Sequence, residues 1–376
     1  MSPQVEQHVA LLPSDVSAST RRRALVLAEG FRLQYRVLRC AAETFNDVFV
    51  LGTRNAVPLR LSSFCRRFIP LVGTRFSDGD DRRINQVCDE FGITFVLPSC
   101  LASTRFLARH RHLINASCFP VPSPEVFDQL DDKWRFVALC GELNVPHPST
   151  QCFATRDDLL AAAASGEAPM PAVVKPLAMW GSAGVLKIEA TDEIDKLEID
   201  YQPILLQAFF PGRDLSAFYC CRQGEVASSA IYCKTSRELE FMKNASIDQH
   251  ARRIIGWLGY DGVLGFDVRQ ADDGSIAFIE CNPRFWYNMN LVMIAGLNFV
   301  AIGSDESVSA GDHPNDLTAE SVTRPWALLG KLSTPWTLTA SDWNALSHHL
   351  RDPLPIACMA IQRLMGLYDI ANGLQL

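Results

Sequence analysis

Three oxygen-bearing side chains in the segment 263–284 could together bind a divalent cation. Two strand-like runs flank Asp273–Gly274, a dipeptide that strongly favours a two-residue hairpin loop. Such a loop would put Asp267 directly opposite Glu280, with Asn282 on the same face because side chains alternate along a strand. Two carboxylates so close repel each other unless a cation neutralises them or one binds a proton. Oxygen ligands of this kind suit Mg²⁺, which also keeps waters and substrate phosphates in its coordination shell.

The residues around this hairpin strengthen the prediction. Arg269 continues the polar face, and Arg284 follows the second strand directly. Gly265, opposite Asn282, would leave room for a metal-bound ligand. We expect the opposite face to rest on a core, because it carries only apolar residues: Leu264, Phe266, Val268, Ile279 and Cys281. The alternative is a solvated hairpin face whose charges have no function.

A second motif, upstream, could bind an anion. The apolar run 172–174 leads to Lys175, whose ammonium group at a strand end offers a point charge for phosphate. It is followed by Gly181, Ser182 and Gly184, where the glycines allow backbone N–H groups to converge on an anion. The alternative for this Gly-Ser turn is an ordinary hairpin loop. Its position directly after a Val-Val-Lys-Pro strand favours the anion-binding interpretation.

The elements that must position these residues follow from the apolar patterns. Short apolar runs alternate with helix-like stretches over residues 20–120, which predicts a parallel sheet with helices on its faces. The runs are 24–28, 48–51, 68–72 and 93–97, with a helix over 81–91. Further helices are predicted from Ser123–Pro124, from Asp132–Lys133, from a capping Thr155 and from Ser246, and strands around 185–188 and over 204–210.

These motifs together resemble the ATP-grasp superfamily, of the carboxylate–amine/thiol ligase type similar to carbamoyl phosphate synthetase and D-alanine–D-alanine ligase. The resemblance rests on Gly265–Arg269 followed by Ile279–Arg284, on the order of the lysine and glycine motifs before them, and on the segment 205–214. It covers residues 123–300. It implies an α/β fold, with α+β character in the lid, in which two subdomains enclose ATP behind an N-terminal parallel-sheet domain.

The resemblance implies the following domains and roles. The N-terminal α/β domain would comprise residues 1–122, the lid with the glycine loop 123–206, the subdomain with the metal site 207–310, and a helical extension 311–376. Roles implied by matching position are metal binding for Asp267, Glu280 and Asn282, catalysis for Arg284, Arg269 and Lys234, and nucleotide binding for Lys133, Lys175, Gly181, Ser182, Gly184, Gln207, Phe209, Phe210 and Asp214. One position departs from the family, because Ala208 stands where an acid is common.

Most similar enzymes are carboxylate–amine ligases, so the resemblance implies amide or peptide bond formation through an acyl phosphate. ATP and Mg²⁺, with Mn²⁺ as a substitute, would be the cofactors, and a small amino-acid-like acid and an amine the substrates. The rival within enzymes is phosphorylation of bicarbonate or carbamate, as in a carboxylase subunit. The rival outside enzymes is a nucleotide-binding module without catalysis.

Three smaller questions stay open in the sequence. Lys234 is as consistent with a surface lysine as with a phosphate contact. Phe285, Trp286 and Tyr287 could shape an acceptor pocket or fill a core, and burial statistics favour the core. Glu29, after the first strand, could line a cleft of the kind that open sheets form. The eight histidines include no His-x-x-x-His pair, so we expect packed or surface histidines.

Composition excludes several classes of protein. The chain has 376 residues, 48% hydrophobic and 20% charged, which is typical of globular domains. A net charge of −7 gives no support for nucleic-acid binding. The apolar runs are far shorter than a membrane helix, no secretory signal is visible, and the twelve cysteines show no Cys-x-x-Cys spacing. We therefore expect a cytoplasmic protein with reduced thiols, no nucleic-acid or membrane partner, and leave a homodimer open.

Overall fold

The fold contains three sheets, the first of them parallel. The computed structural model describes residues 21–177, 184–305 and 317–365. The first sheet has the strand order β3-β2-β1-β4-β5, which confirms the predicted N-terminal α/β unit. Its strands are β1 (Arg23–Ala28), β2 (Asp47–Gly52), β3 (Cys65–Pro70), β4 (Phe95–Leu97) and β5 (Ser117–Cys118). Its helices are α1 (Arg32–Ala42), α2 (Asp80–Phe91) and α3 (Leu101–His110), with 3-10 helices η1 (Arg54–Leu61) and η2 (Arg111–Leu113).

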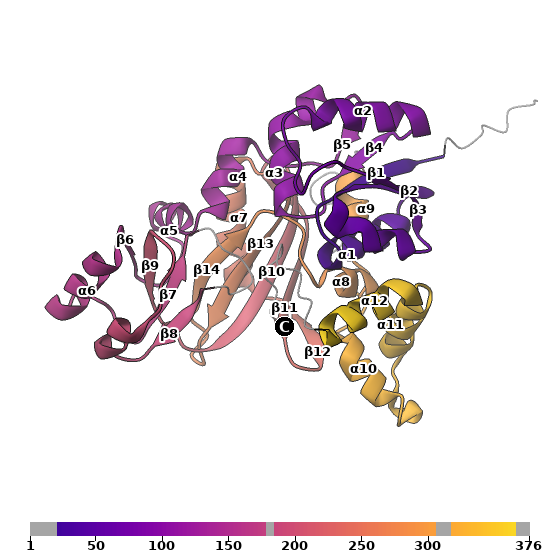
Figure 1. Ribbon diagram of the computed structural model, residues 1–376. Coiled ribbons are helices and arrows are strands. Elements are labelled where there is room, and N and C mark those ends of the chain that lie inside the picture. Colours follow the sequence, from indigo (N-terminus) through magenta and orange to yellow (C-terminus); the bar gives the residue numbers. More distant parts are fainter. Residues whose placement is uncertain (1–20, 178–183, 306–316, 366–376) are drawn as a thin grey trace, which may run out of the picture.

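The second sheet is antiparallel and lies at the centre of the molecule (Figure 1). Its strand order is β14-β13-β10-β11-β12-β15. The strands are β10 (Arg213–Arg222), β11 (Glu225–Lys234), β12 (Glu238–Met242), β13 (Gly262–Gln270), β14 (Ile276–Asn282) and β15 (Ser321–Thr323). One face is covered by α7 (Ala245–Leu258), α4 (Pro124–Asp131) and α5 (Lys133–Glu142), which share one hydrophobic core with it.

The third sheet is smaller and lies at the end of the molecule opposite the parallel sheet (Figure 1). Its strand order is β6-β9-β7-β8, all antiparallel pairs. The elements are β6 (Thr150–Phe153), α6 (Arg156–Ser165), β7 (Ala172–Pro176), β8 (Leu186–Ile188), η3 (Thr191–Lys196) and β9 (Ile204–Ala208). The predicted Thr155 cap is confirmed, because its hydroxyl accepts from the N–H of Asp158 at 3.2 Å.

The other face of the central sheet joins it to the N-terminal unit. Helices α8 (Met289–Ile294) and α9 (Phe299–Ser304) pack between that face and α1, within one continuous core. Large aromatic side chains fill this junction, and Phe218 stacks on Trp286 with ring centroids 3.9 Å apart. The parallel sheet and the central sheet are therefore held as one body through α1, α8 and α9.

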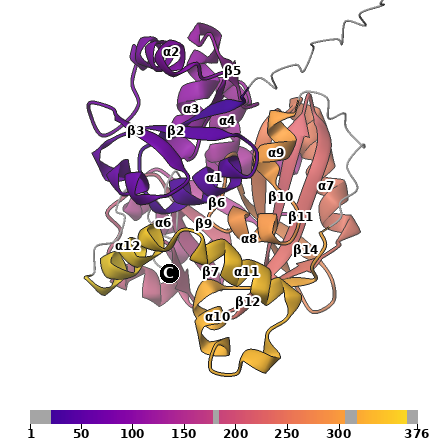
Figure 2. The ribbon, with the colours of Figure 1, turned by 90° about the vertical axis from the view of Figure 1, so that its right-hand side faces the viewer.

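The region after residue 316 is mostly helical, as expected, but it also completes the central sheet. Strand β15 pairs antiparallel with β12, which the sequence did not indicate. The helices are α10 (Pro325–Lys331), η4 (Pro335–Thr337), α11 (Ala340–Leu350) and α12 (Pro353–Leu364). Figure 2 shows α11 beside α8, and α11 and α12 lie under α1. The C-terminal extension is thus bound to the sheet and to the N-terminal unit at once.

Three expectations about the whole chain can be compared with the structure. The boundary expected between residues 206 and 207 falls inside β9, and α4 and α5 pack on the central sheet although they precede the small one. All twelve cysteines are without a disulfide. No helix in the described ranges has both the length and the apolar composition needed to cross a bilayer.

Candidate nucleotide and metal site

The predicted pair of carboxylates forms at the edge of the central sheet. Strand β13 pairs with β14 so that Asp267 lies opposite Glu280 and Gly265 opposite Asn282, which confirms the predicted register at these positions. The Asn282 side-chain amide donates to Asp267 Oδ2 at 3.2 Å and to Glu280 Oε1 at 3.4 Å. One amide therefore bridges the two acids, and all three side chains converge on one point.

The two carboxyl groups differ in their electrostatic surroundings. Burial, and then the charge of Glu280, raise the pKa of Asp267 to about 7. Burial also opposes ionisation of Glu280, but Lys133 and Lys175 outweigh it and lower the pKa of that carboxyl. The pair thus carries less than two full negative charges on its own, and a divalent cation would favour full ionisation of both.

The donor set fits a magnesium ion. Two opposed carboxylates and an amide supply hard oxygen ligands, the chemistry that Mg²⁺ prefers. In this structure Asn282 Nδ2 faces the acids while Oδ1 accepts from Arg284 Nη2 at 2.7 Å, so the amide must rotate about its last side-chain bond to offer its oxygen to a metal. Among the described residues no group of three or more His, Cys, Asp or Glu side chains could hold a metal, so the amide is needed to complete the set.

The hairpin reaches this register by a different route from the one predicted. Its loop has three residues, 272–274, since the N–H of Ala271 donates to the carbonyl of Ser275 at 2.9 Å. Gly274 adopts φ 86°, the left-handed conformation that closes such a loop. A β-bulge between Asp267 and Val268 then shifts the register by one and compensates for the extra residue. The two-residue loop was wrong, while the pairing at the acids was right.

The bulge also corrects the expected faces of β14. Phe278 is fully buried, pairs with Val268 and lies in the core. Ile279, predicted on that apolar face, instead lines the cavity beside Glu280. The physical reason is that the bulge adds one unpaired residue, so two neighbouring side chains no longer alternate strictly.

Two buried lysines face the acids from different elements. Lys133 is the first residue of α5, whose N-cap Asp132 accepts from the N–H groups of residues 134 and 135 at 2.9 and 3.0 Å. Its Nζ lies 3.5 Å from Glu280 Oε2. Lys175 extends from β7, is 4% exposed, and donates to Gln207 Oε1 at 2.9 Å. Burial lowers the pKa of Lys175 to about 8, against the opposing effect of Glu280.

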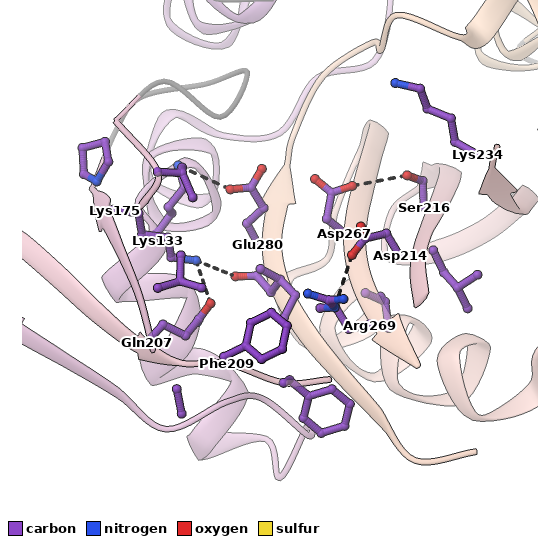
Figure 3. A pocket seen from close by; sticks show the side chains of 18 residues that line it. Lys133, Lys175, Gln207, Phe209, Asp214, Ser216, Lys234, Asp267, Arg269 and Glu280 are labelled. Carbon is purple, nitrogen blue, oxygen red and sulfur yellow. Dashed lines mark hydrogen bonds and ion pairs between the residues drawn. The ribbon is translucent and has the colours of Figure 1, made fainter. Parts of the chain in front are cut away.

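These groups line one cavity of about 470 Å³ between the small and the central sheet. Figure 3 shows Lys133, Lys175 and Gln207 on one side of the cavity, and Asp267, Ser216 and Lys234 on the other. The volume lies in the range of small-molecule sites. The predicted site residues that line it are Lys133, Lys175, Gln207, Phe209, Phe210, Asp214, Lys234, Asp267, Arg269 and Glu280.

Residues 207–210, part of the segment predicted to bind the nucleotide, line one side of this cavity. Gln207 is buried in β9 and also donates to Thr150 Oγ1 at 3.0 Å. The ring of Phe209 lies under Lys187 Nζ, 4.0 Å from the centroid, and under the Arg269 guanidinium at 4.8 Å. Arg269 Nε is 3.3 Å from Asp214 Oδ1, whose side chain is 87% exposed. Arg269 is therefore held at the Phe209 end of the cavity.

The remaining predicted residues lie as follows. Lys234 stands at the end of β11, where it is exposed but still lines the cavity. Partial desolvation by its surroundings, and then the charge of Arg324, lower the pKa of its amine. Arg284 is half-buried beside Asn282 and also donates to the carbonyl of Phe285 at 3.3 Å. Gly184 adopts φ 69°. Gly181 and Ser182 lie outside the described residues.

Gly265 has a different role from the one expected. A Cβ there would lie 2.1 Å from the ring of Phe218 on β10, so the glycine makes room for this ring and not for a metal-bound ligand. Phe218 in turn stacks on Trp286. Phe285 and Trp286 are 2% and 4% exposed, which confirms the core interpretation for these two aromatics. Tyr287 is half-buried and lines another cavity.

Sequence reasoning missed Ser216 and Lys187. Ser216 pairs with Asp267 across β10 and β13, and its hydroxyl donates to Asp267 Oδ1 at 3.4 Å. Its alternation with Asp214 along one strand was a usable signal, because both side chains must share a face. Lys187 lies on β8 over Phe209, and only the pairing of β7 with β8 brings it there.

Comparison with known proteins agrees with this geometry. A family model described as ATP-grasp in the biosynthetic pathway with Ter operon matches residues 200–324, which include β10 to β15 and both acids. The carboxyaminoimidazole ribonucleotide synthase of Aspergillus clavatus, solved with ATP, superposes with a TM-score of 0.59 at 17% identity, over 75% of each chain. Residues 200–324 therefore match an ATP-grasp family model, and the chain as a whole has the fold of this synthase.

The chain is also similar to a ligase of known structure and to a synthase subunit. The L-amino acid ligase of Bacillus licheniformis superposes with a TM-score of 0.56 at 16% identity, over 76% of this chain and 73% of that one. The arginine-specific carbamoyl phosphate synthase large chain of Geobacillus stearothermophilus is 26% identical over 179 residues. That stretch is 43% of this chain but 17% of the relative, so this chain spans a small part of that protein's length.

Proposed function

We propose that this protein is an ATP- and Mg²⁺-dependent carboxylate–amine ligase that forms an amide bond through an acyl phosphate, on a small amino-acid-like acid. The observation that carries the proposal is the single cavity in which Lys133, Lys175, Asp267 and Glu280 converge. Cations at one wall and an ionisable acid pair at the other suit a nucleotide triphosphate with its metal.

In the proposed reaction, a carboxylate oxygen of the acid attacks the γ-phosphorus of ATP. The bond from that phosphorus to the β-phosphate oxygen breaks and ADP leaves. The amine nitrogen then attacks the acyl carbon, the carbon–oxygen bond to phosphate breaks, and inorganic phosphate leaves as the nitrogen loses a proton. This chain would supply mainly orientation and charge neutralisation.

The residues of the cavity have distinct parts in this proposal. Lys133 and Lys175 bind the phosphates, with Lys234 as a further phosphate contact from β11. Segment 207–210 receives the adenine, and Asp214 the ribose. Asp267, Glu280 and Asn282 would hold Mg²⁺, which would neutralise charge on the phosphates. The planar fork of Arg284, beside Asn282, would bind the acid's carboxylate in two contacts.

The contacts of Arg269 favour a different role from the one first expected. The resemblance assigned it to catalysis, together with Arg284. Its ion pair with Asp214 and its position over the Phe209 ring favour a role in ordering the base and ribose end of the nucleotide. The glycine loop that the resemblance implies as a lid includes residues 181 and 182, so its part stays a prediction.

The comparisons also leave room for the carboxylase-type alternative. A carbamoyl phosphate synthase and a carboxyaminoimidazole ribonucleotide synthase are among the proteins that this chain resembles, beside an L-amino acid ligase. The proposed ligase is favoured because a second, partly apolar cavity lies next to the phosphate-binding end, as described below. Bicarbonate itself would not fill such a cavity, but the acceptor of a carboxylase would, so the mass of the product decides between the two.

The test is ADP formation with amino acids offered in pairs, with bicarbonate as a parallel arm, and with product mass read by mass spectrometry. Release of ADP that needs both an acid and an amine, with a product heavier by the expected condensation, supports the ligase. Release with bicarbonate alone supports the alternative. Nucleotide binding without any turnover would leave a binding module, and the proposal would be wrong.

One substitution tests the part assigned to Arg284. Arg284→Lys keeps the charge but removes the fork, so amide formation should fall at least about tenfold while ATP affinity stays unchanged. Arg82→Met, an exposed arginine on α2, is the matched control. Unchanged turnover in Arg284→Lys would contradict the assigned role.

A further inference from the structure

A second cavity, of about 120 Å³, lies where α1, α8 and the C-terminal helices meet. It is close in size to engineered cavities that bind benzene. Its apolar wall includes Tyr287, Leu291, Trp326 and Met359, whereas arginines 32, 36 and 324 supply positive charge. Residues from four distant parts of the chain therefore enclose one small, partly apolar space.

Helix α1 presents a row of three arginines to this region, of which Arg32 and Arg39 are buried and Arg36 is half-buried. Arg32, Arg36 and Arg39 follow one another at spacings of four and three residues, so they share a helix face. Arg36 lies over the Tyr287 ring, 3.7 Å from its centroid, and Arg39 donates to the carbonyl of His348 at 2.8 Å. Within the described part of the chain, none of the three forms an ion pair with a carboxylate, although a buried cation normally requires one.

Arg32 is the least satisfied member of this row. It is 3% exposed, and no described residue offers a hydrogen-bond acceptor to its Nε or its Nη2, both of which are buried. These two atoms form one edge of the guanidinium, the fork that binds a carboxylate or phosphate through two parallel hydrogen bonds. An oxyanion within the cavity would supply both missing acceptors.

His349 adds a neutral group to the same wall. Burial, and then the charges of Arg36 and Arg39, lower the pKa of its ring to about 4, so the ring is uncharged at neutral pH. Its Nε2 is buried and has no partner among the described residues. The wall can therefore provide a further polar contact without adding to the positive charge.

The second cavity adjoins the phosphate-binding end of the first. Arg324 lines the second cavity, and its charge acts on Lys234, which lines the first. Burial raises the pKa of the Tyr232 hydroxyl, which lies within interaction range of Asn288 in the second cavity and of Asp267 in the first. A molecule in the second cavity would thus lie near the end of the nucleotide where phosphate is transferred.

We propose that this cavity binds a small substrate through a carboxylate or phosphate group held by the Nε–Nη2 edge of Arg32, with its apolar body against Tyr287, Leu291 and Met359. The inference rests on the proposed ligase, since it names the chemistry of that enzyme's second substrate. The C-terminal extension becomes part of the binding site, because Arg324, His349 and Met359 close the cavity over α1.

The experiment uses the full-length protein and four probes: benzoate, phenyl phosphate, neutral benzamide and inorganic phosphate. Affinities are measured by calorimetry and the position of the tighter anion by crystallography. We expect benzoate or phenyl phosphate to bind, with the oxyanion on Arg32, and benzamide to bind at least tenfold more weakly. The tighter of the two anions identifies a carboxylate or a phosphate substrate. Equal affinity for benzamide, or an anion located elsewhere, overturns the proposal.

Two variants of Arg32 distinguish bidentate binding by the guanidinium from simple attraction by a positive charge. Arg32→Lys should weaken binding of the anion at least tenfold, and Arg32→Met still more, while Arg82→Met leaves it unchanged. If Arg32→Met does not fold, the conservative variant and the crystallographic position still decide. Unchanged affinity in Arg32→Lys, with the anion away from Arg32, would overturn the proposal.

Binding of ATP with Mg²⁺ to the same preparations keeps the two proposals apart. Wild-type protein that binds benzoate on Arg32 but binds no nucleotide would contradict the ligase and leave the anion site standing. Protein that binds nucleotide normally, but whose anion affinity is the same in wild type and Arg32→Met, would contradict the anion site alone.

Discussion

The two cavities differ in how their charges are balanced. In the first, Lys133 and Lys175 face Asp267 and Glu280, so each buried charge has an opposite charge nearby. In the second, Arg32 and Arg36 have no carboxylate partner among the described residues. A site that balances its own charges can stay folded without a ligand. A site with uncompensated cations depends on an anion from outside.

The largest expected effect comes from removing the acids of the balanced cavity. Asp267→Asn and Glu280→Gln should each lower ADP formation by about 10³-fold, because each removes a charge that the metal needs. Stability should change little in Asp267→Asn, since a carboxyl with a pKa of about 7 is already partly protonated at neutral pH. Coupled ADP assays and thermal melts provide the two measurements. Full activity in either variant would show that the pair is structural.

A smaller effect is expected from the lysine side of that cavity. Lys175→Met should weaken nucleotide binding by about tenfold to a hundredfold, or about 1.4 to 2.8 kcal/mol. The fold should persist, because burial already disfavours the charged amine. Calorimetric titration with ADP measures the change, with the exposed Lys196→Met as control. Equal affinities in the two variants would exclude Lys175 from phosphate binding.

The aromatic core that joins the central sheet to α8 and α9 can be tested at Gly265. The added Cβ of Gly265→Ala would lie 2.1 Å from the Phe218 ring, so the stack with Trp286 must move. We expect a loss of about 1–3 kcal/mol in the free energy of unfolding, as for other overpacked cores. Urea unfolding gives this value. Full stability would mean that Phe218 can rotate away without cost.

The buried histidine beside the arginines of α1 should make the free energy of unfolding depend on pH. Burial, and then Arg39, lower the pKa of His348 to about 2, from an ordinary value near 6.5. The unfolded chain therefore binds one more proton than the folded chain below pH 6.5, and stability falls as the pH decreases towards 4, by about 1.4 kcal/mol per pH unit for this one group.

The control is His348→Asn, which keeps an acceptor for Arg39 but cannot titrate. Over pH 4–6, the loss of stability in this variant should be smaller than in wild type by that slope. Identical slopes in urea unfolding at four pH values would contradict the shifted pKa. A reduced slope would support a neutral His348 ring that is buried beside Arg39.

The sequence predicted the features that depend on near neighbours along the chain. The parallel sheet, the caps at Ser123, Asp132 and Thr155, and the pairing of Asp267 with Glu280 all follow from local pattern. The roles assigned to the site residues stay predictions, and their convergence on one cavity supports them.

The features that it did not predict depend on contacts between distant segments. The bulge that moves Ile279 into the cavity compensates for a loop five residues away, and no single residue type marks it. Gly265 makes room for the ring of Phe218, which is 47 positions earlier in the chain. The second cavity draws on α1 and α12, more than 300 residues apart, so only the folded chain reveals it.

The β-bulge has a practical consequence for protein engineering. It places the three-residue loop at 272–274 four to five residues away from the paired acids, at the tip of the hairpin. Gly274 is solvent-exposed, and a Cβ there would meet no other atom within 4 Å. This loop is therefore a suitable place for an epitope tag or a fluorescent label on the central sheet.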